Sequence, residues 1–139
     1  MYFVYKSNAE IDEYGYVMFE VEGDEQLFSF RVGISEMVLA EFFSDLSSML
    51  NGEIHSFAVD GNEAMTYYTF KRNGKELRIE TKHHHIHEVY EFSFHNFCKA
   101  LQVAFRKFFR QQRMNNKEEA TQEILDEWII FNKTISLFY

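Results

Sequence analysis

The run His83-His84-His85-Ile86-His87 is the densest set of metal-ligating side chains in the sequence. On an extended strand His83, His85 and His87 share one face, and three imidazoles are a ligand set for zinc or nickel. Same-face residues of a strand, however, lie about 7 Å apart, at a rise of about 3.3 Å per residue. Without a turn or bulge the three rings cannot meet at one ion. The sequence therefore leaves two alternatives, a metal site at His83, His85 and His87 or a polar strand face without metal.

Cys98 is the only cysteine, so the chain forms no internal disulfide. His95 precedes it by one helical turn, which would pair a thiol with an imidazole near a helix start. A cysteine nucleophile also needs an oxyanion pocket and an orienting group, and no motif locates either. Because Cys98 adjoins an apolar helical stripe, we expect a buried, unreactive thiol.

Other local signatures of catalysis are missing from the sequence. There is no phosphate-cradling glycine loop, no nucleophile elbow, no paired cysteine motif and no dinucleotide fingerprint. The sequence therefore names no catalytic residue and no cofactor, and it favours a binding protein over an enzyme.

Charge divides the chain. Residues 1–92 carry 7 Lys or Arg against 17 Asp or Glu, a net charge of −10, whereas residues 93–139 carry 7 against 5, a net charge of +2. General nucleic-acid binding requires cations that replace phosphate counterions, so a net charge of −8 argues against it. The balance favours a basic protein as partner.

One predicted strand side combines aromatic, methionine and acidic side chains. Its residues, with those of the adjoining turn, are Tyr16, Met18, Glu20, Glu22, Asp24 and Glu25. An aromatic centre with an acidic rim is typical of a protein interface. We therefore expect these residues to bind the partner, unless the chain's own helices cover this side.

The elements that position these residues follow from periodicity. Apolar residues alternate with polar ones in residues 14–22 and 25–32, which Gly23-Asp24 joins, as in a half-buried hairpin. Asp60-Gly61 and Asn73-Gly74 likewise join predicted strands at residues 53–59, 64–72 and 75–82. Residues 87–92 and 2–6 are expected to add a last and a first strand.

Helical spacing appears three times. A helix capped by Ser35 and ended by Gly52 separates the two strand groups, and another runs from Ser93 to about residue 113. Asn116 and Glu119 form a capping box for a third helix. The order predicts a single α+β domain over residues 1–139, in which an antiparallel meander sheet of six or seven strands carries the two C-terminal helices on one face.

The second of these helices concentrates positive charge. Its cations and those that follow it are Lys99, Arg106, Lys107, Arg110, Arg113 and Lys117. Arg106, Arg110 and Arg113 share one face at helical spacing. This face is either ordinary solvated surface, a contact for an acidic group, or half of a homodimer in which it meets the acidic sheet of a second copy.

Localisation is predicted from what the sequence lacks. No run of about 18 apolar residues is present, so no membrane span or membrane partner is expected. The first residues have no basic stretch followed by an apolar core, so no signal peptide is expected. A cytoplasmic location is the resulting prediction.

The order of these elements resembles that of the small acidic immunity proteins of bacterial polymorphic toxin systems, in particular the group that protects against wall-associated contact-dependent toxins. The residues that carry the resemblance span about 14–110: strands at 16–21 and 28–32, Phe42-Phe43-x-x-Leu46-x-x-x-Leu50-x-Gly52, Phe57-x-x-Asp60-Gly61, Leu77-x-Ile79 and Phe94-x-x-Phe97. The resemblance implies direct binding and neutralisation of a toxin. For a basic nuclease-type toxin, an acidic inhibitor gains association rate from electrostatic steering.

Overall fold

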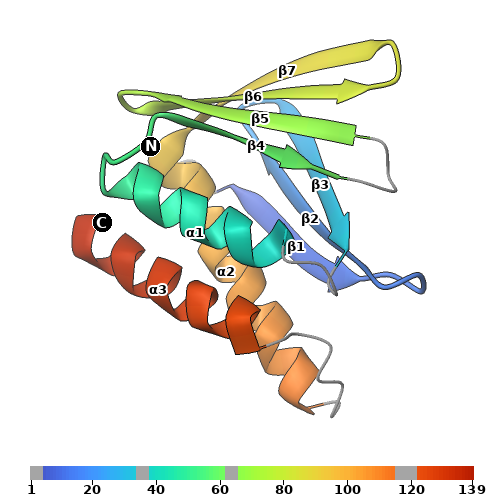
Figure 1. Ribbon diagram of the computed structural model, residues 1–139, viewed down its shortest axis with the longest axis vertical. Helices are drawn as coiled ribbons and strands as arrows, with labels where there is room; N and C mark the ends of the chain where they lie inside the picture. Colours follow the sequence, from blue (N-terminus) through green and yellow to red (C-terminus); the bar gives the residue numbers. More distant parts are fainter. Residues whose placement is uncertain (1–4, 34–37, 62–65, 115–121) are drawn as a thin grey trace.

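In the part of the chain that the computed structural model describes, residues 5–33, 38–61, 66–114 and 122–139, two antiparallel sheets pack with three helices (Figure 1). The first sheet has the order β1-β2-β3, with β1 at Lys6–Ile11, β2 at Tyr16–Gly23 and β3 at Gln26–Gly33. The second has the order β4-β5-β6-β7, with β4 at Ser56–Asp60, β5 at Thr66–Asn73, β6 at Glu76–His83 and β7 at Ile86–Ser93. The helices are α1 at Val38–Leu50, α2 at Phe94–Met114 and α3 at Gln122–Phe138.

The prediction of an α+β fold with antiparallel strands is confirmed, but the prediction of one sheet of six or seven strands is wrong. Side chains occupy the edge of β3 where it meets the second sheet. The Gln26 side chain donates to the Glu91 carbonyl (2.6 Å) and accepts from the Glu91 N–H (2.9 Å), and the Arg31 N–H donates to the Tyr68 hydroxyl (3.3 Å). These bonds take the place of a backbone ladder, so the sheets meet without joining.

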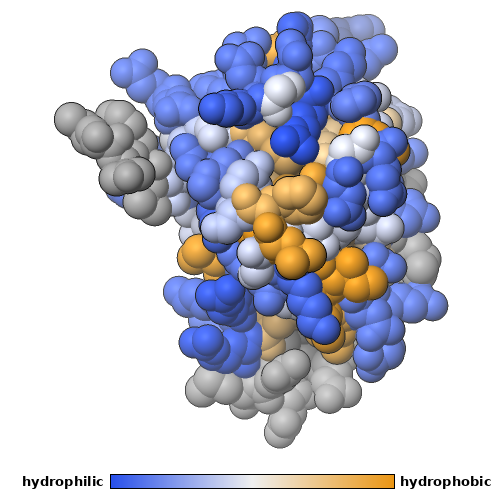
Figure 2. All heavy atoms as spheres, turned by 90° about the vertical axis from the view of Figure 1, so that its left-hand side faces the viewer, coloured by the Kyte–Doolittle hydropathy of each residue, from blue (hydrophilic) through white to orange (hydrophobic). Residues whose placement is uncertain are grey.

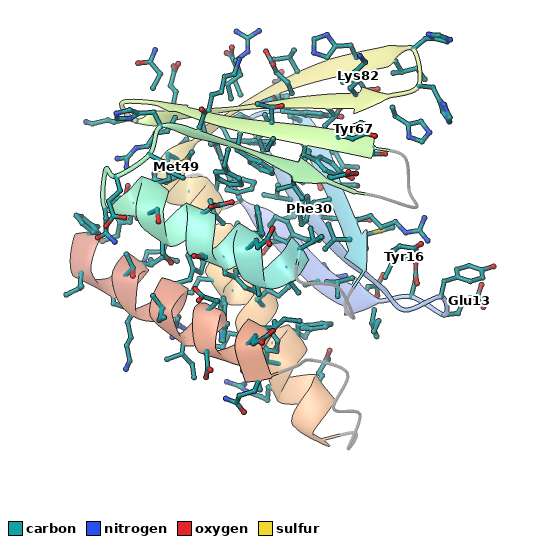
Figure 3. All side chains as sticks on the ribbon, viewed as in Figure 1. Glu13, Tyr16, Phe30, Met49, Tyr67 and Lys82 are labelled. Atoms are coloured by element: carbon teal, nitrogen blue, oxygen red, sulfur yellow. The ribbon has the colours of Figure 1, made fainter. Side chains whose placement is uncertain are left out.

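The alternation of apolar and polar residues gives the first sheet a buried inner face. The inner face of β2 and β3 consists of Val17, Phe19, Val21, Phe28, Phe30 and Val32, all at most 1% exposed. Figure 3 shows Phe30 in the interior, between the sheets and α1. The turn from β2 to β3 is Asp24-Glu25, both at positive φ, one residue later than predicted. Gly23 instead provides space, because a Cβ there would lie 2.1 Å from the Tyr5 ring.

The hairpin of β5 and β6 also turns one residue later than predicted. Asn73 pairs with Glu76, so Gly74 and Lys75 form the turn, and Gly74 supplies the positive φ of 62° that a tight turn requires. His83 pairs with Ile86, so His84 and His85 form the next turn, with His84 at a φ of 55°.

The helices α1 and α2 cover the inner faces of both sheets, and α3 completes the aromatic core. Phe97 of α2 lies among rings of both sheets: Phe19, Phe28, Phe70 and Phe92, with centroid separations of 5.9 to 6.4 Å. Phe43 of α1 contacts Phe131 and Trp128 of α3 (5.8 and 5.5 Å), so α3 packs on α1 and not on a sheet. None of the helices in the described ranges is long and apolar enough to cross a membrane.

Some predicted features lie outside the described residues. They are the helix cap at Ser35, the capping box of Asn116 and Glu119, Lys117, and the starts of the strands predicted at residues 2 and 64. The same holds for the side chain of Arg113.

Candidate binding surface

The outer face of the first sheet gathers carboxylates from two strands. Cross-strand pairing places three residues in each row: Lys6, Glu22 and Leu27; Asn8, Glu20 and Ser29; Glu10, Met18 and Arg31. Within the described part of the chain, none of Glu10, Glu20 and Glu22 forms an ion pair. The predicted residues Tyr16, Met18, Glu20 and Glu22 therefore share this face, which we call the acidic sheet face.

No described helix covers the acidic sheet face, because α1 and α2 pack on the opposite, apolar side of the sheet. Glu22, Asp24 and Glu25 are exposed, whereas Tyr16, Met18 and Glu20 are half-buried. The alternative that helices bury this side does not hold for the described residues. Leu27, which is 57% exposed, adds apolar area beside Glu22 that the sequence did not single out.

Arg31 contributes little free positive charge to the acidic sheet face. Its guanidinium forms an ion pair with Asp12 (2.8 Å) and lies 4.4 Å from the centre of the Tyr16 ring. Figure 3 shows Tyr16 near the turn that links β1 to β2. Asp12 also accepts the backbone N–H groups of Tyr14 and Tyr16 in that turn. Asp12 therefore both fixes the turn between β1 and β2 and neutralises the charge of Arg31.

These bonds make stability depend on pH. The hydrogen bond from the Tyr16 N–H lowers the pKa of Asp12, helped by the Tyr14 N–H and Arg31. A lowered folded-state pKa adds stability above the unfolded-state pKa of about 3.9, and that stability is lost as pH falls through the folded-state value. We expect Asp12→Asn to be less stable than the parent protein at pH 7, and the difference to shrink below about pH 4.

Urea unfolding between pH 2.5 and 7 measures this difference, with Glu13→Gln, an exposed acid of the same turn, as the control. A gap between Asp12→Asn and the parent protein that stays constant over this range would show that the Asp12 carboxylate does not stabilise the turn.

A groove lies at the corner between the two sheets. The second sheet extends beyond β3, as the β6–β7 hairpin in Figure 1 shows, and its inner face is open there. The groove measures about 300 Å³, and its lining residues come from four strands: Leu27, Ser29, Thr66, Tyr68, Thr81, His83, Ile86, Glu88 and Tyr90. We call it the corner groove. Because Leu27 also lines a smaller hollow with Lys6, Glu20 and Glu22, the corner groove continues into the acidic sheet face.

The turn at His84-His85 separates the three histidines that the sequence offered as an alternative metal site. His83 lies on the inner face of β6 and lines the corner groove, and its Nδ1 is 2.8 Å from the Thr66 hydroxyl. His87 pairs with Lys82 on the outer face, and His85 lies in the turn itself. The run is therefore not one extended strand, and His83, His85 and His87 do not share one face. Among the residues described, no three His, Cys, Asp or Glu side chains are grouped to hold a metal ion.

Cys98 and His95 do not form a reactive pair. Cys98 is fully buried, as predicted, and burial raises the pKa of its thiol. The exposed His95 ring instead stacks on Tyr139 at a centroid distance of 4.0 Å, and partial burial lowers its pKa. This thiol is therefore not suited to nucleophilic chemistry.

Charged residues also occupy the helices. Arg106, Lys107 and Arg110 are exposed on α2, on the opposite side of the first sheet from the acidic sheet face.

A second acidic surface, which the sequence did not indicate, lies in a groove between α1 and α3. Its acids are Glu41, Glu123, Asp126 and Glu127. Unlike the acidic sheet face, this surface has no large apolar side chain among the described residues that line it.

An apolar surface lies at the end of α3. Leu137 is 82% exposed and Phe138 is 52% exposed. Figure 2, which views this side of the molecule, shows apolar surface within a hydrophilic surround. Exposed apolar area of this kind is typical of contact surfaces, but it carries no charge that would select a partner.

The acidic sheet face and the corner groove together form one continuous surface with carboxylates, phenols and apolar side chains, among them Met18, Leu27 and Ile86. Its carboxylates are suited to binding a cationic surface. Comparisons of the chain with protein-family models, with curated proteins and with solved structures found no match.

Proposed function

We propose that this protein is a non-enzymatic binding protein that docks a basic protein on the acidic sheet face. One observation carries the proposal. The carboxylates of Glu10, Glu20 and Glu22 have no ion-pair partner in the described chain. In the cross-strand rows of the sheet they lie beside Met18 and Leu27. An acidic rim accelerates association with a cationic surface, and apolar residues at its centre supply contact area.

The resemblance in element order to the immunity proteins of toxin systems supports a more specific role for this binding protein. An immunity protein binds its toxin directly, and a toxin nuclease is basic because it binds nucleic acid. We therefore propose neutralisation of a basic toxin as the role of the acidic sheet face, with blocking of the toxin's cationic active site as the mechanism.

Affinity capture without a tag tests this function. The protein is immobilised and exposed to a lysate of its source organism at low salt, and retained proteins are eluted by a salt gradient and identified by mass spectrometry. We expect retention of a basic protein that elutes with salt, since charge attraction is screened over about 10 Å at 0.1 M. Retention of only acidic proteins, or of this chain itself through the basic α2 surface, would contradict the proposal.

A further inference from the structure

Glu88 is the main charged residue of the corner groove. It lies on the inner face of β7 with Ile86 and Tyr90. The Tyr90 hydroxyl donates to one oxygen of the Glu88 carboxylate. In the described residues no Lys, Arg or His forms an ion pair with Glu88. The groove therefore contains a carboxylate that is held in place and lacks a cation.

Tyr90 is fixed by packing. Its ring lies 5.2 Å from Phe28 in an edge-on arrangement and is stacked parallel to Phe92. Burial, with the hydrogen bond to Glu88, raises the pKa of Tyr90 to about 12, so its hydroxyl remains a donor at neutral pH. A rotamer fixed in this way reduces the entropy that Glu88 loses when a ligand binds.

The remaining polar groups of the groove are hydroxyls and one imidazole. Tyr68 already accepts the Arg31 N–H, and His83 is paired with Thr66. Thr81 and Ser29 line the groove as well, while Leu27 and Ile86, 57% and 59% exposed, provide apolar sides. A carboxylate beside an aromatic ring, hydroxyl acceptors and apolar sides matches a planar cation with several N–H donors.

We propose that the corner groove is a socket for an arginine side chain of the basic partner, in which Glu88 accepts the guanidinium and the Tyr90 ring flanks it. Arginine fits better than lysine because its planar fork donates to a carboxylate and to neighbouring hydroxyls at once and stacks on aromatic rings. The inference rests on the proposed function and names the anchor of the partner. The acidic sheet face would then provide the charged rim around this anchor.

Small probes test the socket without the partner. N-acetyl-arginine methylamide is titrated into the ¹⁵N-labelled protein, and amide shifts are followed by NMR, with N-acetyl-lysine methylamide as the comparison. We expect the arginine probe to shift the amides of Thr81, His83 and Glu88, and to do so at lower concentration than the lysine probe.

Substitutions on β7 identify the group responsible. Loss of a charge-assisted hydrogen bond corresponds to about a tenfold or greater weakening, so Glu88→Gln should raise the half-saturating arginine concentration by at least that factor. Tyr90→Phe, which removes the hydroxyl that positions Glu88, should raise it by about threefold. Glu91→Gln is the matched control, because Glu91 lies on the opposite face of the same strand and should leave binding unchanged.

Three results would overturn the socket. They are equal half-saturation by the two probes, an unchanged affinity in Glu88→Gln, and shifts confined to the amides of Asn8 and Glu20. The last result would leave the acidic sheet face as the binding surface, so it separates failure of the socket from failure of the proposed function.

Discussion

Phe97→Ala lowers the free energy of unfolding by about 3 to 5 kcal/mol, the range for a large aromatic side chain removed from a core. Phe97 has no exposed surface, and its ring contacts both sheets, through Phe19 and Phe28 on one side and Phe70 and Phe92 on the other. In the described residues the two sheets share no backbone ladder, so these ring contacts, with the side-chain hydrogen bonds at the edge of β3, fix their angle. Total stabilities are typically about 5 to 15 kcal/mol, so this loss is a large fraction of the whole.

Urea unfolding followed by circular dichroism measures the effect. Val103→Ala is the matched control on the same helix, because Val103 is 60% exposed and its truncation should change stability by at most about 0.5 kcal/mol. A cost below about 1 kcal/mol for Phe97→Ala would show that Phe97 does not join the sheets.

Charge reversal of the acidic sheet face has the largest expected effect on binding. We expect Glu10→Lys combined with Glu20→Lys to lower affinity for the captured basic partner by about 100-fold at low salt, because like charges facing each other across an interface cost several kcal/mol. The cross-strand neighbours of these residues include Asn8, Met18 and Ser29, which are uncharged, so the sheet should tolerate both lysines.

Glu53→Lys combined with Glu76→Lys is the control for net charge. Both residues are exposed and lie away from the acidic sheet face, Glu53 in the loop before β4 and Glu76 at the start of β6. Binding isotherms at low and high salt for the two double variants and the parent protein measure the effect. If both double variants weaken binding equally, the partner senses overall charge and not this face.

The strands β2 and β3 and the outward side of the first sheet could be predicted from the sequence, whereas β1 spans Lys6–Ile11, of which only Lys6 belongs to the strand predicted at residues 2–6. Alternation in β2 and β3 is local, so it identifies both the buried residues and the polar side that carries Glu20 and Glu22. The separation into two sheets depends on contacts between distant residues, such as Gln26 with Glu91 and Tyr68 with Arg31. Periodicity holds no information about such pairs, which is why one continuous sheet was predicted.

The predicted turn positions were wrong for a related reason. Gly23 matches a turn signal, but its lack of a side chain is required by the Tyr5 ring, and Asp24 and Glu25 adopt the positive φ values. In the histidine run the two-residue turn places His83 and His87 on opposite faces. A sequence of five residues shows neither where a hairpin turns nor which ring approaches a glycine.

The corner groove had no signal in the sequence. Its residues come from β3, β5, β6 and β7, so neither spacing nor composition groups Leu27 with Glu88. Only Glu88 and Tyr90 could be placed together from the sequence, because residues two apart on a strand share a face. Only the crossing of the sheets places this pair beside the acidic sheet face.

Hydrogen exchange of the complex tests the central claim most directly. Amide exchange of the free protein is compared with that of its complex with the captured partner, by mass spectrometry over peptides that cover each element. We predict slower exchange in β1, β2 and β3 on binding, with α2 unchanged. Protection confined to α2, or to the acidic groove between α1 and α3, with β1 to β3 unchanged, would contradict the account.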